Sequence, residues 1–281
     1  MAYAHRVAPG TKIKLRKYDP DRTVGLQKDE ALERFAKLSA ELGGLQEELY
    51  AAGQHAALVI LQGMDTSGKD GTIRRVFESV NPQPCHVWPF KVPTKEELAH
   101  DFLWRVHQVV PRTGLFGIFN RSHYEDVLVA RVRRLVPKDV WKARYAQINH
   151  FEALLAASGT IVLKFFLHIS KEEQKERLLK RERDPAKAWK LSAGDWGDHA
   201  RWEDYMKAYA DALSRCSTEA APWYIVPANH KWFRDLAVCD VVVQTLKSYR
   251  SVWRATLVDM SKTRLAELKA IHKRHRSERR S

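Results

Sequence analysis

An apolar run followed by a glycine-rich loop decides the fold class: Ala56-Ala57-Leu58-Val59-Ile60-Leu61-Gln62 leads into Gly63-Met64-Asp65-Thr66-Ser67-Gly68-Lys69-Asp70-Gly71-Thr72. A strand that is apolar on both faces is typical of the centre of a parallel sheet. Gly63 and Gly68-Lys69 match the spacing G-x-x-x-x-G-K, in which backbone N–H groups surround phosphate oxygens and a helix begins at the lysine. We therefore predict a phosphate-binding loop composed of Gly63, Thr66, Ser67, Gly68, Lys69, Asp70, Gly71 and Thr72.

Two carboxylates in this loop depart from the usual pattern. Asp70 stands where a serine or threonine commonly follows the lysine, and Asp65 lies inside the loop. A carboxylate repels phosphate unless a cation lies between them. We interpret Asp65 as a magnesium ligand, with a hydrogen bond to its own turn as the alternative. Asp70 fits the first turn of a helix, where an acid interacts favourably with the helix dipole.

A second polar cluster, Asn120 to Asp126, follows the apolar run Gly114–Phe119. Ligands of open α/β sheets bind beyond the carboxyl ends of strands, so this cluster should face the loop. Arg121 can bind a phosphate oxygen with two hydrogen bonds, and Glu125 and Asp126 can complete the oxygen shell of a metal. Which of these two carboxylates binds the metal stays open. The alternative is a structural ion-pair network at a helix start, with His123 as a hydrogen-bonded spacer.

Strand and helix patterns alternate along the chain. Strand patterns at 85–88, 114–119, 160–168 and 223–226 alternate with helical patterns at 28–52, 69–80, 95–109, 124–135, 139–157 and 171–183. This alternation predicts an α/β fold with a doubly wound parallel sheet. We expect a basic N-terminal arm (1–27), a single domain (28–250) with a helical lid at about 184–220, and a basic helical tail (251–281).

The composition restricts the partner and the location. The 281 residues contain 48 Lys and Arg and 34 Asp and Glu, a net charge of +14, which favours an anionic partner. The chain has no apolar run of membrane-spanning length, no signal-peptide core and only three scattered cysteines, so we expect a cytoplasmic protein without a membrane partner. A nucleic-acid partner is disfavoured because the tail lacks interleaved aromatic residues and the loop carboxylates would repel a phosphate backbone.

Taken together, these motifs resemble the polyphosphate kinase 2 family between about Gly10 and Leu246. The segments that carry the resemblance are GMDTSGKDGT (63–72), FKVPT (90–94), AHDFLWR (99–105), FNRSHYEDVLVARV (119–132), RERDP (181–185) and PWYIVPANHKWFR (222–234). The resemblance implies a three-layer P-loop kinase-like fold, a homo-oligomer (dimer or tetramer), and Mg²⁺ or Mn²⁺ as cofactor. It also implies phosphate transfer between inorganic polyphosphate and AMP, ADP or ATP. The wording NRSHYED is similar to the subclass that accepts both nucleoside mono- and diphosphates.

The resemblance also assigns residues. Asp65, Lys69 and Arg121 correspond to the family's loop aspartate, loop lysine and post-strand arginine, and Asp126 or Glu125 to its second metal carboxylate. Arg181, with Arg177 beside it on the same helix face, corresponds to a lid arginine. Lys69 and Arg121 would hold the terminal phosphate while an ionised nucleotide oxygen attacks in line, without a strong general base. Candidate cations for a polyphosphate track are Arg74, Arg75, Lys91, Arg131, Arg133, Arg177, Arg181 and Lys190.

Two other functions stay open at this point. An ATP-dependent nucleoside monophosphate kinase would share the loop and the lid but would need no long cationic track. A non-catalytic P-loop protein that binds nucleic acid through a basic face would show steep salt dependence and no turnover.

Overall fold

A computed structural model describes residues 2–188 and 193–278 of the chain. Its centre is a six-stranded sheet in the order β1-β6-β5-β2-β4-β3, in which only the short edge strand β1 runs antiparallel. The strands are β1 (His5–Arg6), β2 (Ala56–Gln62), β3 (Cys85–Pro89), β4 (Phe116–Asn120), β5 (Thr160–His168) and β6 (Trp223–Pro227). The predicted α/β fold with a doubly wound parallel sheet is therefore confirmed, with β1 as an additional antiparallel strand.

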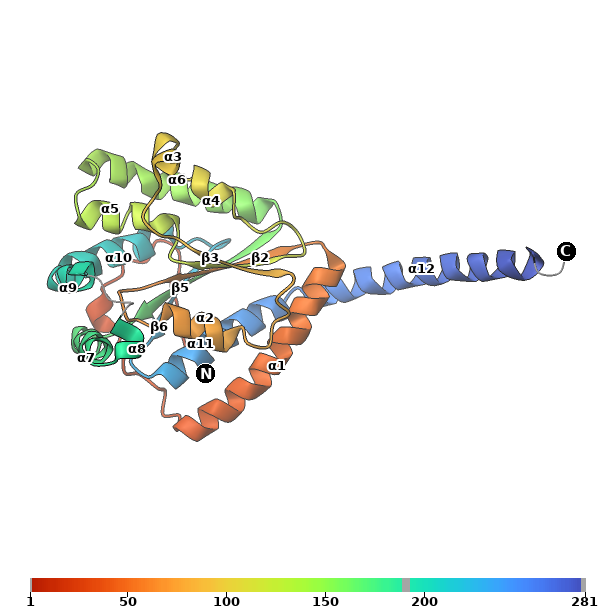
Figure 1. Ribbon diagram of the computed structural model, residues 1–281, viewed down its shortest axis with the longest axis horizontal. Coiled ribbons are helices and arrows are strands. Elements are labelled where there is room, and N and C mark those ends of the chain that lie inside the picture. Colours follow the sequence, from red (N-terminus) through yellow and green to blue (C-terminus); the bar gives the residue numbers. More distant parts are fainter. Residues whose placement is uncertain (1, 189–192, 279–281) are drawn as a thin grey trace.

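Helices cover both faces of the sheet, giving three layers (Figure 1). The helices are α1 (Lys28–Ala52), α2 (Lys69–Val76), α3 (Lys95–Ala99), α4 (Trp104–His107), α5 (Val129–Val132), α6 (Lys138–Ala157), α7 (Lys171–Glu182), α8 (Pro185–Ala188), α9 (Ala193–Ala200), α10 (Trp202–Cys216), α11 (Lys231–Lys247) and α12 (Arg250–Glu278), with the 3-10 turns η1 (Leu15–Lys17) and η2 (His123–Asp126). Helices α1, α2 and α11 lie on one side, and α4, α6 and α10 on the other.

The central strand β2 contributes to the hydrophobic core on both faces of the sheet, because all of its side chains are buried. Leu58 and Ile60 belong to a cluster with Val106 of α4 and Leu155 of α6. Val59 and its neighbours along the other face belong to the cluster formed with α1 and α11. Burial on both faces is the arrangement that a continuous apolar run predicts for a parallel strand.

Two predicted helices are wrong in extent. The segment 95–109 holds two short helices, because a capping box at Thr94 starts α3 and Asp101 accepts from the Leu103 amide between α3 and α4. The segment 124–135 holds the turn η2 and the four-residue α5, since the Ser122 hydroxyl caps η2. Both interruptions arise from local side-chain caps, which compete with a continuous helix.

The N-terminal residues are also more ordered than an irregular arm. His5 and Arg6 pair with Ile225 and Tyr224 of β6, and Val7 is buried against the body. The pairing adds a sixth strand, which covers the edge that β6 would otherwise expose.

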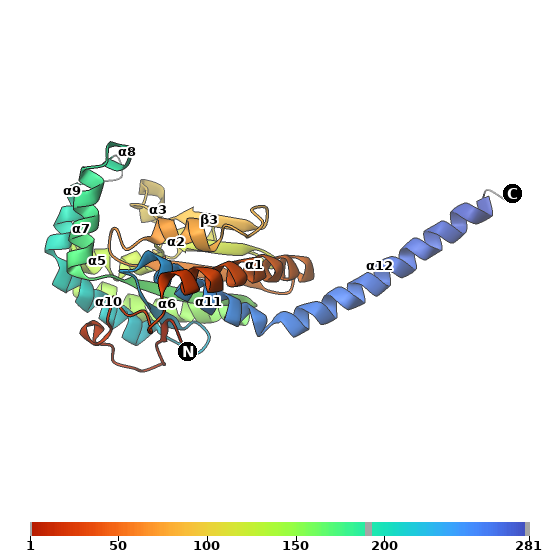
Figure 2. The ribbon, with the colours of Figure 1, turned by 90° about the horizontal axis from the view of Figure 1, so that it is seen from below.

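The segment after α7 is helical over its described residues. Helices α7, α8 and α9 stack at one end of the body and rise above it (Figure 2). The second half of the predicted lid, α10, buries Tyr205, Tyr209 and Leu213 in the core and is part of the body. At the opposite end α12 projects away from the body (Figures 1 and 2). Within the described ranges, no helix combines the length and apolar character that a membrane span requires.

Candidate active site

The glycine loop connects β2 to α2 and has a backbone that only its residue types permit. Gly68 lies at a φ of +105°, and a Cβ there would lie 1.8 Å from Nη1 of Arg234. A Cβ on Gly63 would lie 2.8 Å from the carbonyl oxygen of Leu167. Thr66, a non-glycine residue, lies at a φ of +64°, a sparsely populated conformation that is enriched at ligand-binding loops.

Lys69 begins α2 and directs its ammonium group into the loop. Its Nζ donates to the carbonyl oxygens of Gly63 at 2.7 Å and Met64 at 3.2 Å. Burial, followed by the neighbouring Arg121 charge, lowers the pKa of Lys69 to about 8, although nearby carboxylates, Asp65 first, oppose the shift. The Lys69 side chain thus places its ammonium group inside the loop.

Asp70, the next residue, lies in the first turn of α2, as predicted for a dipole-favoured acid. Its Oδ1 accepts from Nδ2 of Asn120 at 2.7 Å, which joins the start of α2 to the end of β4. In the loop itself, the Ser67 hydroxyl oxygen is buried and has no hydrogen-bond partner among the described residues. A buried hydroxyl without a partner is the kind of group that a bound phosphate would satisfy.

The second polar cluster meets the loop at the ends of β2 and β4. These strands are parallel and pair Leu61 with Asn120, and the Arg121 amide donates to the Leu61 carbonyl at 3.0 Å. The Arg121 guanidinium donates to Oδ1 of Asp65, and at 3.2 Å to Oε2 of Glu125. Arg121 is also strained, with a φ of +64°.

The charge around Asp65 follows from this geometry. Burial alone would raise the pKa of Asp65, but the positive charges of Arg121, Lys69 and Arg181 outweigh burial and hold that pKa below its ordinary value. Asp65 therefore stays ionised and faces a group of cations. The predicted encounter of the two strand ends brings together Asp65, Lys69, Arg121 and Glu125.

Asp126 faces a different neighbour. Its carboxylate oxygen Oδ1 accepts from Nη1 of Arg144 on α6 at 3.0 Å, and burial raises its pKa to about 6. Glu125 and Asp126 thus point to different arginines, one toward the loop and one toward α6. This difference separates two carboxylates that the sequence leaves equivalent.

The donor set suits a divalent cation that shares its ligands with a substrate. Asp65 and Glu125 converge on one guanidinium, and the described residues contain no group of three or more His, Cys, Asp or Glu that could hold a metal. Mg²⁺ is usually bound by one or two carboxylates together with waters and substrate phosphates. The residues therefore fit a metal whose remaining ligands come from phosphate and water.

The loop is supported from behind by two arginines. Nη1 of Arg177 donates to the Thr66 carbonyl at 2.9 Å, its Nη2 donates to the carbonyls of Ala228 and Asn229, and its Nε donates to Glu173. The expectation that Arg177 is a lid and polyphosphate-track cation is not met in this structure, because its guanidinium is directed into the protein.

Arg234 of α11 is the second support, and the sequence analysis assigned it no role. It is buried, its guanidinium contacts the Ser67 carbonyl, and it fills the space beside Gly68. An arginine within the mostly apolar helix α11 is the signal that could have identified it, since buried charges are normally paired.

The other predicted cations occupy different surroundings. Arg181 is half-buried and contributes to the positive field at Asp65, and Arg133 contributes there as well while it pairs with Asp198 at 2.7 Å. Arg75 is not brought to the loop, because it pairs with Glu78 and lies over the ring of Phe35. Arg74 and Lys91 are exposed, and Lys190 lies outside the described residues.

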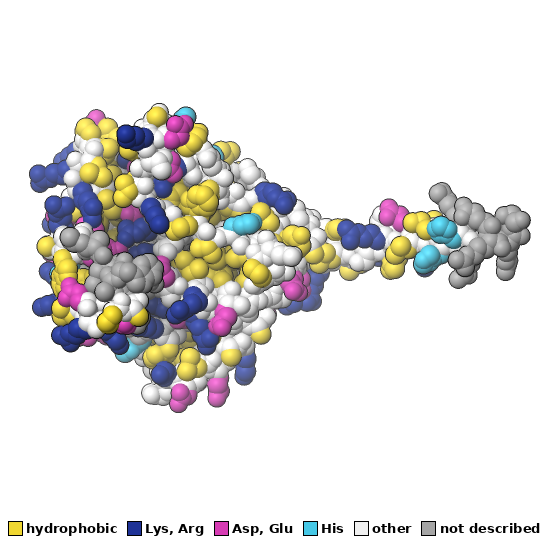
Figure 3. All heavy atoms as spheres, in the orientation of Figure 1, with side chains coloured by type: hydrophobic (Ala, Val, Ile, Leu, Met, Phe, Trp, Pro, Cys, Tyr) yellow, Lys and Arg dark blue, Asp and Glu magenta, His cyan; other side chains and the backbone are white. Residues whose placement is uncertain are grey.

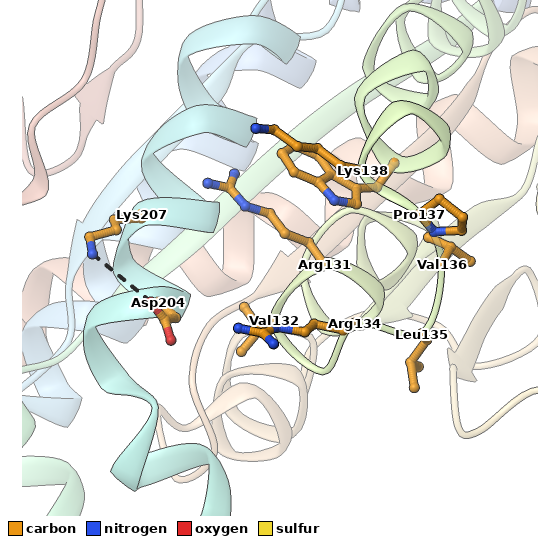
Figure 4. Close-up of a pocket in the computed structure, with 10 residues that line it drawn as sticks. Arg131, Val132, Arg134, Leu135, Val136, Pro137, Lys138, Asp204 and Lys207 are labelled. Carbon is orange, nitrogen blue, oxygen red and sulfur yellow. Dashed lines mark ion pairs between the residues drawn. The ribbon is translucent and has the colours of Figure 1, made fainter.

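Arg131 lines a cavity of about 640 Å³ between α5, the start of α6 and α10 (Figure 4). Its guanidinium lies over the indole of Trp141 and pairs with Asp211 at 2.7 Å. Three further cations line the same cavity, Arg134, Lys138 and Lys207, the last at 3.9 Å from Asp204. This hollow is cationic, but the loop residues do not line it.

A three-layer α/β fold with a glycine loop and lysine at the end of a central strand defines the class of P-loop kinase-like proteins. A family model described as "Polyphosphate kinase 2 (PPK2)" matches residues 25–252. The chain belongs to the polyphosphate kinase 2 family.

Individual relatives agree with this assignment. The chain is 54% identical over 245 residues to a protein of Meiothermus ruber named AMP/ADP-polyphosphate phosphotransferase, covering 86% of this chain and 92% of that protein. It is 42% identical over 264 residues to the ADP-polyphosphate phosphotransferase of Rhodopseudomonas palustris, covering 89% and 91%. The crystal structure of polyphosphate kinase 2 from Arthrobacter aurescens TC1 superimposes with a TM-score of 0.82 at 39% identity, covering 92% of this chain and all of that one.

Proposed function

We propose that this chain transfers phosphate between inorganic polyphosphate and the nucleotides AMP and ADP, forming ADP and ATP reversibly. The observation that carries the proposal is the convergence of Asp65, Arg121 and Glu125 around the Lys69 loop. Cations and carboxylates alternate there, which suits two phosphate groups with a metal between them. The relatives named for AMP/ADP-polyphosphate and ADP-polyphosphate phosphotransfer support the choice of substrates.

The residues of the loop bind and neutralise the transferring phosphate. Lys69 and the loop amides would contact its oxygens, and Arg121 would take a further oxygen from the end of β4. A terminal phosphate oxygen of the nucleotide is already ionised, so no side chain is needed to remove a proton. Catalysis then rests on positioning and on neutralising charge in the transition state.

Asp65 and Glu125, with Asp126 as the alternative to Glu125, would hold Mg²⁺ or Mn²⁺. When bound, the metal supplies charge neutralisation between the donor and acceptor phosphates. In the structure Arg121 forms ion pairs with both Asp65 and Glu125. To bind the metal, these carboxylates would have to give up their contacts with the guanidinium.

A long polyanion needs further cations outside the loop. Arg133 and Arg181 supply positive charge next to Asp65, and Arg131 with Arg134, Lys138 and Lys207 supplies it in the neighbouring hollow. Figure 3 shows Lys and Arg side chains gathered over the end of the body that carries α5, α7 and α9. We propose that this face guides the polyphosphate chain. The homo-oligomer and the cytoplasmic location stay predictions.

The test supplies ADP, and separately AMP, with long-chain polyphosphate and Mg²⁺ in the absence of ATP. We expect ATP to form from ADP, and ADP from AMP. An ATP-dependent monophosphate kinase would produce nothing under these conditions, and a nucleic-acid-binding protein would bind without turnover, so either result contradicts the proposal.

The Lys69→Ala variant tests the loop within the same assay. Removing the only side-chain cation inside the loop should lower the rate by about a hundredfold or more, because the electrostatic contribution to phosphoryl transfer is large. Lys28→Ala, an exposed lysine at the start of α1, is the matched control and should keep full activity. Near-normal activity of Lys69→Ala would rule out the assigned role.

A further inference from the structure

A charged side chain is buried in the middle of the sheet, away from the loop. Lys164 lies on β5 and is fully buried, as is Glu152 on α6. The Lys164 ammonium donates to Oε2 of Glu152 at 2.5 Å, to the Tyr124 hydroxyl at 2.9 Å and to the Cys216 carbonyl at 2.5 Å. An ammonium group has three donors, and here all three are used.

The other half of this network is the turn η2. The Tyr124 hydroxyl donates to Oε1 of Glu152 at 2.9 Å, and Nε2 of His123 lies 3.2 Å from the same oxygen. Because a carboxylate oxygen only accepts hydrogen bonds, Nε2 of His123 is the donor in this contact. Two successive residues of η2 are therefore tied to one carboxylate, and that carboxylate is tied to β5.

The residues that face the loop lie just before this turn or within it. Arg121 lies two positions before His123 and adopts a left-handed φ of +64°, and Glu125 follows Tyr124 directly. A strained residue of this kind persists only when the surrounding structure over-determines it. The buried network is attached at His123 and Tyr124, which lie between Arg121 and Glu125 in the sequence.

A buried ion pair is by itself weak evidence for a role in stability. Burying an ion pair removes both charges from water, and well-packed apolar side chains of similar volume are often as stabilising. An apolar replacement would fill the space between β5 and α6 but would not fix the direction of η2. The hydrogen bonds from His123 and Tyr124 to Glu152, in contrast, join η2 to α6 at two successive side chains.

We propose that Lys164 and Glu152 are positioning residues for phosphoryl transfer: by holding His123 and Tyr124, they fix the orientation of Arg121 and Glu125 at the loop. Neither residue touches substrate in this account. The inference rests on the proposed function for its catalytic consequence, but the orientation of Arg121 can be measured without turnover.

Two variants each remove one group from the network. Tyr124→Phe removes one oxygen and keeps the buried ring, and Glu152→Gln removes the charge with little change of volume. We expect kcat for ATP formation from ADP and long-chain polyphosphate to fall about tenfold, with both KM values within about twofold of the wild type, because positioning acts on the transition state.

The matched controls are Tyr224→Phe, on the strand β6, and Glu48→Gln, whose carboxylate pairs with Arg250 far from the loop. Both should keep kcat near the wild-type value, whatever their effect on the melting temperature. If Glu152→Gln does not fold, Tyr124→Phe decides the question. Full kcat in folded Tyr124→Phe, or an equal loss of kcat in Tyr224→Phe, would overturn the proposal.

A second readout separates this inference from the proposed function. The Nε–H resonance of Arg121, assigned by its loss in Arg121→Lys, reports the orientation of the guanidinium by NMR. We expect it to shift or broaden in Tyr124→Phe and to stay unchanged in Tyr224→Phe. Should wild-type protein make no ATP, the proposed function fails while this measurement still decides the positioning role; an unmoved Arg121 signal in Tyr124→Phe refutes that role.

Discussion

At the loop, the available space and the backbone conformation restrict which residue type fits at a given position. Gly68 adopts a φ of +105° and has no room for a side chain, because Arg234 occupies the position of a Cβ. The same arginine contacts the Ser67 carbonyl, so the glycine and the arginine form one local arrangement. A substitution at Gly68 should therefore act on the shape of the loop and on activity together.

Gly68→Ala tests this pairing. We expect the variant to lose about 2 kcal/mol or more of unfolding free energy and most of its activity, since Arg234 must move and the alanine is held at positive φ. Gly25→Ala is the control, because Gly25 has a φ of +80° with open space around it. It should cost about 1 kcal/mol and leave turnover unchanged. Equal effects of the two substitutions on activity would mean that the close approach of Arg234 to Gly68 does not shape the loop.

A buried histidine gives a pH dependence of stability. His168 ends β5, its Nε2 donates to the Tyr18 carbonyl at 3.1 Å, and burial lowers its pKa to about 4. Between pH 6.5 and 4 the unfolded chain binds a proton at this site that the folded chain does not, so stability falls as the pH decreases through this window. The contribution is about 3 kcal/mol, from 1.36 kcal/mol per unit of pKa.

His168→Gln keeps a donor for the Tyr18 carbonyl and cannot titrate. Urea unfolding at pH 7 and pH 4 should show a smaller loss of stability in this variant than in the wild type. Identical losses would mean that His168 is protonated in the folded protein at pH 4.

At the scale of elements, the predictions succeeded where one local signal sets the limits. The helix α1 (28–52) and the strand β5 (160–168) have the predicted bounds, because periodic or continuous apolar residues define them. The short helices α3, α4 and α5 were predicted as longer ones, since side-chain caps interrupt them. The pairing of His5 and Arg6 with β6 joins residues more than two hundred positions apart, and no local pattern reports it.

The site shows the same division. Asp65, Lys69 and Arg121 meet as the motifs indicate, because the loop and the end of β4 have a fixed relation in a parallel sheet. A spacing of four placed Arg177 and Arg181 on one helix face but could not say that Arg177 faces the back of the loop. The turn η2 separates Glu125 from Asp126, and its direction depends on Glu152 and Lys164, which are distant in the sequence.

The helix α12 is held to the body only by its first turns. Trp253 is fully buried and its indole N–H donates to Nδ1 of His55, while Arg250 and Arg254 pair with Glu48. The described residues from Ser261 onward, where their side chains are described, are exposed.

Two truncations separate these parts. Ending the chain after Ser261 should leave the melting temperature within about 2 °C of the wild type, because the side chains described beyond that residue are exposed. Ending it after Tyr249 removes Trp253 and should destabilise the protein by about 3 kcal/mol or more, the usual cost of losing a buried tryptophan. Circular dichroism melts compare the two, and a large loss in the first truncation would contradict the assignment of contacts.

At the scale of the whole molecule, charge and architecture point to the same partner. The net charge is +14, and Figure 3 shows Lys and Arg side chains gathered over the end of the body that carries α5, α7 and α9. The loop lies toward the same end, since Arg181 of α7 and Arg133, next to α5, contribute to the positive field at Asp65. The tail α12 leaves from the other end, beside His55 at the start of β2. This arrangement supports the proposal that the cationic face guides a polyanion that extends from the loop.

Salt should then weaken the binding of long polyphosphate more than that of short polyphosphate. The phosphates far from the loop bind only to exposed cations, and salt screens these interactions. Raising NaCl from about 0.05 M to about 0.5 M shortens the screening length from about 14 Å to about 4 Å. We expect the KM for long-chain polyphosphate to rise severalfold more than the KM for tripolyphosphate, with ADP held saturating. The double variant Lys138→Ala and Lys207→Ala, in the hollow beside α5, should reduce this difference, whereas Lys28→Ala should not. If salt raises both KM values equally, the exposed cations outside the loop do not contact the substrate.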